Sequence, residues 1–289
     1  MPNVKEYNNR LKSLKNTQKI TRTMKMVSAS KLKKAQEAQA NAKFYARKIT
    51  ELLSRISASV ESEYHPLLLK REPSKRALIL VYTSDKGLCG AFNHNAHKQV
   101  INWLEENRHL YEKVDISCCG RKGYQFFQRR EAIKFHYEDV TVSPNFHNAE
   151  KIGNDLMNAF LNFEYDEVFL VYNQFLSPLS QKTIFEKVLP IEPEALVLED
   201  KTLSKEYIFE PEAPQMLEYL IPHFLYFKVY FALLENSAGE HGARMSAMDS
   251  ATKNTSELID QYTILRNRAR QAVITTELTE IVAGAEALH

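Results

Sequence analysis

The feature that most constrains the fold is a stretch of about sixty residues that contains no helix breaker. No Pro or Gly lies between Pro2 and Pro66, and the first Gly of the chain is Gly87. Apolar residues recur in this stretch at the three- and four-residue spacing of one helix face. They are Val4, Tyr7, Leu11, Leu14, Ala35, Ala38, Ala42, Tyr45, Ile49, Leu52 and Ile56. The spacing predicts one helix from about residue 3 to residue 59.

The last quarter of the chain has the same periodicity and predicts a second long helix, from about residue 215 to residue 286. Its apolar stripe begins with Leu217, Leu220, Phe224, Phe227, Phe231, Leu234 and Ala238. Gly239 and Gly242 each cost about 1 kcal/mol in a helix interior, unless they permit a close backbone contact. Pro222 leaves the start of this helix open, because proline disrupts a helix interior.

The region between the two periodic segments alternates strand and helix patterns. Buried strands are predicted at 76–82, 114–118, 167–172 and 182–189, and helices at about 91–108, 121–130 and 146–163. This alternation is typical of an α/β domain with a mostly parallel sheet.

The lengths of the two helices decide the predicted architecture. At 1.5 Å per residue they measure roughly 85 Å and more than roughly 100 Å, whereas a compact globule of this chain length is about 50 Å across. The helices can cover their apolar stripes only by pairing with each other. We therefore predict an antiparallel coiled coil (residues 1–60 and 212–289) that carries an α/β domain (residues 61–211).

Charge is distributed unevenly along the chain. The 289 residues contain 38 Lys or Arg and 36 Asp or Glu, but the first sixty contain 14 basic residues and three acidic ones. This segment indicates either an anionic partner or a solvated basic helix face.

Three cysteines are too few for a disulfide scaffold. No run of eighteen apolar residues occurs, so no membrane span is predicted.

Motifs of the common enzyme classes are missing from the sequence, including GxxxxGK[ST], GxGxxG, HExxH and GxSxG. Gly87 and Gly90 lack phosphate-loop spacing and predict a tight strand-to-helix turn. Cys89 lies near two histidines, and a metal site is a weaker interpretation than surface or capping side chains. We expect no cofactor, no metal and no catalytic residue. Two classes remain open at this point: a protein-coupled shaft, and a free coiled-coil adaptor or nucleic-acid-binding rod.

Four motifs resemble one family, the gamma subunits of F-type (rotary) ATP synthases. They are NTQKITRTMKMVSASK at 16–31, SDKGLCGAFN at 84–93, GARMSAMDSAT at 242–252 and ARQAVITTELTEIVAG at 269–284. The motifs occur in the family's order along nearly the whole chain. The resemblance implies a non-catalytic rotor shaft that couples ion flow through a membrane ring to ATP synthesis or hydrolysis. Nucleic acid is then not expected as a partner.

The resemblance also implies partners and a location. The coiled coil would stand inside a hexamer of alpha and beta subunits, and the α/β domain would contact the epsilon subunit and the ring of c subunits. The basic N-terminal segment would face acidic segments of beta subunits. The location implied is the cytoplasmic face of a bacterial inner membrane, as a peripheral part of the complex.

The resemblance assigns roles to residues that match the family's motifs. Contacts that couple rotor to stator are assigned to Met24, Arg244, Arg270, Gln271 and Thr275. Contacts of the α/β domain with the ring and epsilon are assigned to Tyr207, Phe209 and Glu210.

An antiparallel pairing with equal rise in both helices predicts a register. Residue n lies opposite residues 274 − n to 281 − n, which places Met24 level with about residues 250 to 257. Arg244 would then lie one to two turns away from Met24. The same register leaves the chain beyond about residues 271 to 278 as a single unpaired helix.

Overall fold

The computed structural model describes residues 4–57, 65–192 and 212–286 of the chain. It divides into two compact units, one made of residues 1–28 and 245–289 and the other of residues 29–244. The domain limits expected at residues 60 and 211 stay a prediction. Each unit is described by itself below.

Both long helices are present, as predicted from their periodicity. Helix α1 runs from Val4 to Ser57 and helix α5 from Ala213 to Glu286, without a break at Gly239 or Gly242. Pro222 lies inside α5, so the proline does not mark the start of the helix. An eighteen-residue window of α5 is apolar enough for a membrane span, and 56% of it is buried inside the structure, as in a core helix.

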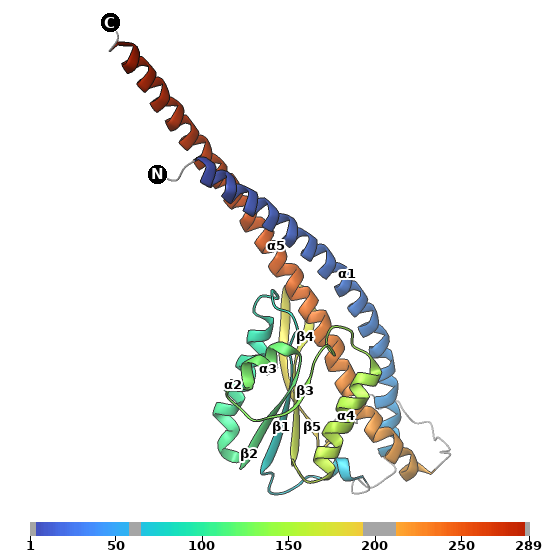
Figure 1. Ribbon diagram of the computed structural model, residues 1–289. Coiled ribbons are helices and arrows are strands. Elements are labelled where there is room, and N and C mark those ends of the chain that lie inside the picture. Colours follow the sequence, from blue (N-terminus) through green and yellow to red (C-terminus); the bar gives the residue numbers. More distant parts are fainter. Residues whose placement is uncertain (1–3, 58–64, 193–211, 287–289) are drawn as a thin grey trace. The chain divides into compact units, whose positions relative to one another are not determined.

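The unit of residues 29–244 is built on a five-stranded sheet of order β3-β2-β1-β4-β5 (Figure 1). The strands are β1 (Arg76–Tyr82), β2 (Lys113–Cys119), β3 (Ile133–Tyr137), β4 (Glu167–Ser177) and β5 (Ser180–Leu189). All neighbouring pairs are parallel except β4 and β5, which form an antiparallel hairpin. The predicted α/β domain with a mostly parallel sheet is therefore confirmed.

Helices cover both faces of this sheet. Side chains of a strand alternate between the two faces, so each strand contributes to two hydrophobic cores. Leu78, Leu80 and Tyr82 of β1 belong to the core under α4 (Phe146–Leu161), α5 and the end of α1. Ala77, Ile79 and Val81 belong to the core under α2 (Phe92–Asn107) and α3 (Arg121–Phe127). Figure 1 shows α2 and α3 on the face opposite α4. Short 3₁₀ helices occur at Pro66–Leu68 and Arg108–Leu110.

Strand β3 was not predicted, and β4 is longer than predicted. The β3 sequence IKFHY places Lys134 and His136 between apolar residues at a sheet edge, and only Tyr137 of the strand is buried. Such a short strand with three half-buried residues gives little periodic signal. Strand β4 continues past Tyr172 because residues 173–175 pair with 181–183 of β5, and Ser177 pairs with Ser180.

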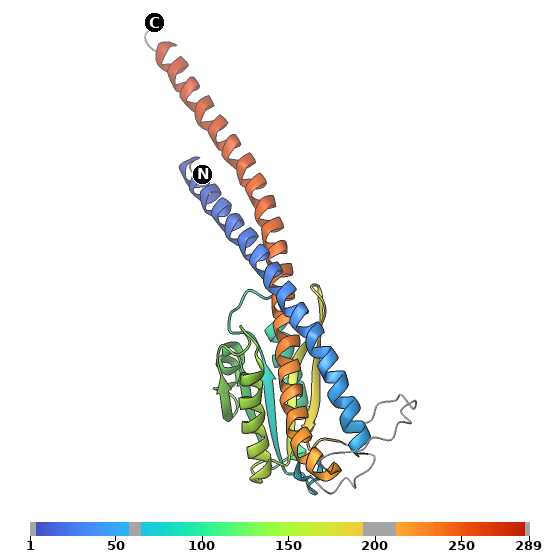
Figure 2. The same ribbon diagram turned by 90° about the vertical axis from the view of Figure 1, so that its right-hand side faces the viewer.

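In the other unit, the start of α1 and the end of α5 pair antiparallel. Lys25 Nζ lies 2.6 Å from Asp249 Oδ1, at the lower limit of the predicted register. Thr252 Oγ1 donates to Thr21 Oγ1 at 2.8 Å. Tyr7 contacts Tyr262, where the equal-rise register expects residues 267 to 274. The observed partner of Tyr7 therefore lies below the range that equal rise predicts, in the part of the unit where the two helices splay apart in Figure 2.

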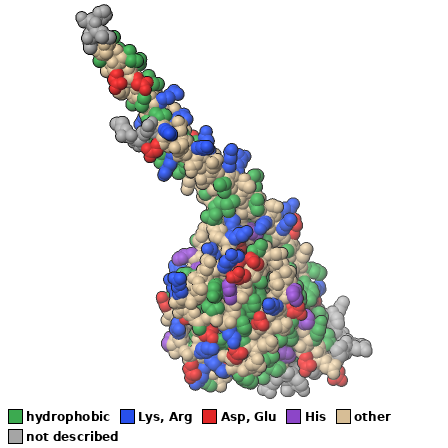
Figure 3. Space-filling model, in the orientation of Figure 1, with side chains coloured by type: hydrophobic (Ala, Val, Ile, Leu, Met, Phe, Trp, Pro, Cys, Tyr) green, Lys and Arg blue, Asp and Glu red, His purple; other side chains and the backbone are tan. Residues whose placement is uncertain are grey.

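The end of α5 in this unit makes no apolar core. All residues from Arg270 to Ala285 are exposed, and they include Val273, Ile274, Leu278, Ile281 and Val282. Residues 4–28 and 245–285 together carry eleven Lys or Arg and six Asp or Glu. Lys and Arg side chains recur along this unit on the face shown in Figure 3.

Candidate functional site

The motif loop, defined here as residues Ser84–Asn93, follows the carboxyl end of β1 and leads into α2. Ser84 N donates to Asn93 Oδ1 at 2.9 Å, and Asn93 Nδ2 donates back to Ser84 Oγ at 2.7 Å. Leu88 and Gly90 both have left-handed backbone, with φ of 63° and 59°. Glycine adopts this conformation without strain, which explains Gly90 in the turn. Gly87 has no positive φ, and a Cβ there would meet nothing closer than 3.9 Å.

Asp85 ties the motif loop to two neighbouring segments of the unit. Its Oδ1 accepts from the Arg121 backbone N–H at 3.0 Å, at the start of α3. Its Oδ2 accepts from Thr141 Oγ1 at 2.8 Å, in the segment after β3. Asp85 is 5% exposed. Asp85 therefore caps α3, not the helix that follows the loop.

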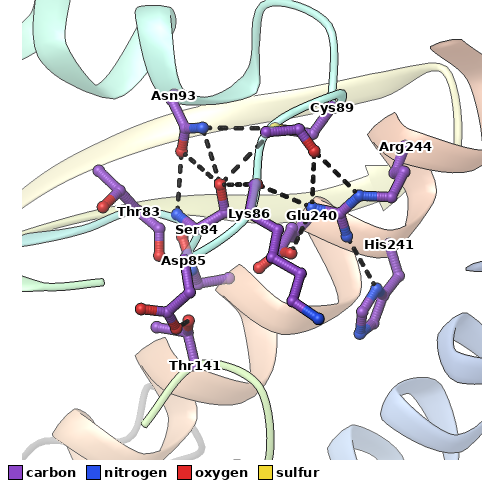
Figure 4. Close-up of polar contacts among 12 residues, drawn as sticks. Thr83, Ser84, Asp85, Lys86, Cys89, Asn93, Thr141, Glu240, His241 and Arg244 are labelled. Atoms are coloured by element: carbon purple, nitrogen blue, oxygen red, sulfur yellow. Dashed lines mark hydrogen bonds and ion pairs between the residues drawn. The ribbon is translucent and has the colours of Figure 1, made fainter. Parts of the chain in front are cut away.

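Arg244 of α5 donates hydrogen bonds to the backbone of the motif loop (Figure 4). Its Nη2 donates to the backbone oxygens of Lys86 at 2.9 Å and Gly87 at 3.2 Å, and its Nε also donates to Gly87 at 3.2 Å. The same Nη2 lies 2.6 Å from Glu240 Oε1, one turn earlier on α5. The Arg244 side chain is 10% exposed and that of Glu240 6%. The guanidinium therefore points into the unit that contains the sheet.

The groups around Arg244 have shifted pKa values. Burial raises the pKa of Glu240, although the adjacent Arg244 guanidinium works in the opposite direction. Burial, together with the positive charges of Arg244 and Lys31, lowers the pKa of His241 to about 4. His241 is therefore neutral at pH 7, and its Nδ1 accepts from Arg244 Nη1 at 3.4 Å.

Helix α5 makes further polar contacts with the sheet just before Arg244. Glu235 Oε2 accepts from the Phe175 backbone N–H of β4 at 2.7 Å. Asn236 Nδ2 donates to the Thr83 backbone oxygen at 3.3 Å. The Gln39 amide of α1 also donates to Glu235. These buried polar residues of α5 were not predicted, because a Glu or Asn in a helical stripe usually faces water.

Gly239 and Gly242 mark close approaches of α5, which resolves the alternative left open from the sequence. A Cβ on Gly239 would lie 2.9 Å from Cε2 of Phe92, and a Cβ on Gly242 would lie 3.0 Å from Cε2 of Phe175. The two glycines let the helix backbone touch the start of α2 and the β4–β5 hairpin.

The predicted coupling residues are divided between the two units, and their shared role stays a prediction. Arg244 belongs to the unit of residues 29–244, whereas Met24, Arg270, Gln271 and Thr275 belong to the other unit. Met24 is half-buried, and Gln271 and Thr275 are exposed. Thr275 Oγ1 donates to the Gln271 backbone oxygen at 2.9 Å. Tyr207, Phe209 and Glu210 lie outside the described residues, so their assignment stays a prediction.

Taken together, the fold and the site define an α/β protein whose long C-terminal helix is held to the sheet by buried polar contacts. Among the residues with described coordinates, no three His, Cys, Asp or Glu side chains form a metal-binding group. The family model described as "ATP synthase" matches residues 3–288.

Relatives with known names match over the full length. The chain is 42% identical over 288 residues to an ATP synthase gamma chain of Trichlorobacter lovleyi, covering 100% of this chain and 99% of that one. It is 43% identical over 290 residues to an ATP synthase gamma chain of Pelotomaculum thermopropionicum, with 100% of both chains covered. The chain belongs to the ATP synthase gamma-chain family. Its role is that of the central-stalk rotor of the rotary ATP synthase.

Solved structures share the fold. A chain in the central stalk and c-ring structure of the Tetrahymena thermophila mitochondrial ATP synthase has a TM-score of 0.60 and 27% identity. The match covers 80% of this chain and 99% of that one. A chain of the Euglena gracilis mitochondrial ATP synthase has a TM-score of 0.68 and 20% identity, with 99% and 94% covered.

Proposed function

We propose that this chain turns inside a hexamer of alpha and beta subunits and passes torque between the hexamer and a membrane ring of c subunits. In this proposal the chain is not itself catalytic, and the epsilon subunit binds its α/β domain. The location is the cytoplasmic face of a bacterial inner membrane, where the chain is peripheral and held by the complex.

The observation that carries this proposal is the exposed end of α5. Fifteen consecutive residues, from Gln271 to Ala285, are exposed on a regular helix with apolar side chains on several sides. An apolar helix end that no other described residue covers suits a surrounding surface on other subunits. A ring of other subunits around this helix end supplies such a surface without binding only one face of the helix. A shaft that turns needs a surface of this kind. Basic residues of the same unit suit acidic segments on that surface.

Copurification and isolated activity test the proposal together. Co-expressed with alpha and beta subunits, the chain is expected to purify with them at one copy per hexamer. The isolated chain is expected to show no ATP hydrolysis, because no set of described residues holds Mg²⁺ and activates water. ATP hydrolysis that persists in the isolated chain through further purification would contradict the non-catalytic role. Failure to bind the hexamer would contradict the shaft and favour the free coiled-coil adaptor or nucleic-acid-binding rod.

Met24→Lys is expected to lower ATP-driven ion pumping while ATP hydrolysis persists. Met24 is half-buried beside Lys25, which pairs with Asp249, so the variant adds a second cation to this level of the shaft. Tighter attachment to an acidic stator segment then hinders rotation at one angle. Both activities are measured in parallel on membranes that carry the variant.

Met26→Lys is the matched control for this variant. Met26 is 59% exposed and points from a different side of the same helix turn. If Met24→Lys and Met26→Lys behave alike, or if hydrolysis and pumping fall equally, coupling is not set at Met24. Changes at the exposed residues Gln271 or Thr275 that weaken the same attachment are expected to restore pumping.

A further inference from the structure

The segment of α5 from Glu235 to Arg244 contacts the sheet through two kinds of interaction. Gly239 and Gly242 lie against the rings of Phe92 and Phe175. Close-packed contacts of this kind set how near the helix backbone lies to the sheet. Hydrogen bonds weaken steeply when their angle changes, so the polar contacts of the same segment add a directional restraint on rotation of α5 about its axis.

The strongest of these polar contacts converge on the motif loop. One Arg244 guanidinium donates to two successive backbone oxygens, at Lys86 and Gly87, and pairs with Glu240 (Figure 4). Charge-assisted hydrogen bonds are about twice as strong as neutral ones. The planar fork of the guanidinium also fixes direction, which a lysine ammonium does not.

Hydrogen bonds connect the motif loop to the sheet and to two neighbouring segments. Ser84 Oγ donates to the Lys86 backbone oxygen at 2.6 Å, and Asn93 Nδ2 donates to Ser84 Oγ. Asp85 joins the loop to α3 and to Thr141. Thr83 joins Ser84 to the end of β1. The backbone oxygen of Thr83 accepts a hydrogen bond from Asn236 Nδ2 of α5. A twist of α5 at Arg244 therefore reaches β1, α3 and the segment after β3.

Glu240 holds Arg244 in the orientation that meets the loop. Glu240 is 4% exposed, and its Oε1 accepts from Arg244 Nη2 at 2.6 Å. Within the described part of the chain, its other oxygen, Oε2, has no hydrogen-bond partner. The carboxylate of Glu240 therefore pairs with Arg244, and Glu240 acts as a residue that positions the Arg244 guanidinium.

We propose that the motif loop, Glu240 and Arg244 form a latch that transmits torque between the sheet and helix α5. The latch rests on the proposed rotor function and adds the place where torque enters the shaft. Ser84 gives the cleanest test, because it is fully buried and presents no side-chain surface to another subunit. Any effect of Ser84 on coupling must therefore pass through the loop.

The experiment uses Ser84→Ala and Glu240→Gln in the assembled ATP synthase, with two measurements on each. Amide hydrogen exchange across residues 84–93 is expected to rise by about tenfold, as the loss of one hydrogen bond to a charged or buried group predicts. The number of ions pumped per ATP hydrolysed is expected to fall. Ser237→Ala is the matched control: Ser237 is also a buried serine, but it lies on α5, outside the motif loop.

A second variant keeps the test decisive if Ser84→Ala or Glu240→Gln fails to assemble. Arg244→Lys retains the charge next to Glu240 but loses the fork, so it is expected to lower the ratio of pumping to hydrolysis in the same direction. Faster exchange in the loop with an unchanged ratio would overturn the latch, and so would unchanged exchange. If the wild-type complex itself does not pump, the rotor function fails; if wild type and all variants pump alike, only the latch fails.

Discussion

Acidification from pH 7 to pH 4.5 is expected to lower the free energy of unfolding of the chain by about 2–3 kcal/mol through His97 alone. His97 lies on α2 and is 8% exposed. Its ring stacks on Phe126 with centroids 4.2 Å apart and meets the edge of Phe127 at 5.4 Å. Its Nε2 has no hydrogen-bond partner among the described residues. An imidazolium at this position would be a buried charge without a counterion.

The pKa of His97 explains the direction of the effect. Burial, with smaller contributions from His94 and Arg130, lowers the pKa of His97 from 6.5 to about 4. Between these two values the unfolded chain binds a proton that the folded chain does not. The stability from neutral His97 is fully present above about pH 6.5 and is lost as the pH falls toward 4.

Urea unfolding at pH 7 and pH 4.5 measures this effect in His97→Phe. Phenylalanine keeps the ring stacking and cannot titrate, so the variant should lose much less stability on acidification than the wild type. His241, whose pKa is also lowered to about 4, keeps its share of the pH dependence in both proteins. His109→Phe, at an exposed position, is the control and should follow the wild type. An equal loss in His97→Phe and wild type would refute this account of His97.

Replacing Gly153 by alanine is expected to destabilise the chain by about 2 kcal/mol or more, as overpacking does in a filled core. Gly153 lies on α4 against α5, and a Cβ there would overlap the Tyr226 ring, with Cε1 at 3.1 Å. Tyr226 is buried and its hydroxyl donates to Asn154 Oδ1 at 2.6 Å, so the ring has little freedom to move. Helices α4 and α5 must therefore separate.

Gly284→Ala provides the control for the same chemical change. Gly284 is an exposed residue of α5, and a Cβ there would meet nothing within 4 Å. Alanine in an open helix position should raise stability by about 0.5–1 kcal/mol. Thermal unfolding of both variants measures these opposite changes in stability. A gain in stability at both positions would show that α4 and α5 do not pack tightly at Gly153.

The sequence was sufficient to predict the two long helices and most of the sheet. A stretch without Pro or Gly that keeps its apolar spacing permits few other structures, and strands such as RALILVY are continuous apolar runs. Strand β3 escaped prediction because Lys134 and His136 interrupt its apolar residues at a sheet edge. Pro222 suggested a boundary that α5 does not have, since the helix begins nine residues earlier, at Ala213.

The candidate site was harder to predict, because its chemistry depends on tertiary contacts. Nothing local distinguishes Glu235 and Glu240 from surface glutamates, yet both are buried and hydrogen-bonded. The motif match assigned Arg244 to contacts that couple rotor to stator. In the structure its donors bind Lys86, Gly87 and Glu240, a set of contacts that no spacing rule reveals.

Direct observation of rotation tests the central claim, that this chain is the turning shaft of the complex. The three native cysteines are buried, so a cysteine introduced at the exposed His147 offers a single site for a gold particle. With the hexamer fixed to a surface through its beta subunits, addition of ATP should turn the particle in one direction, and removal of ATP should stop it. ATP hydrolysis by the same complexes with the particle stationary would contradict the rotor account.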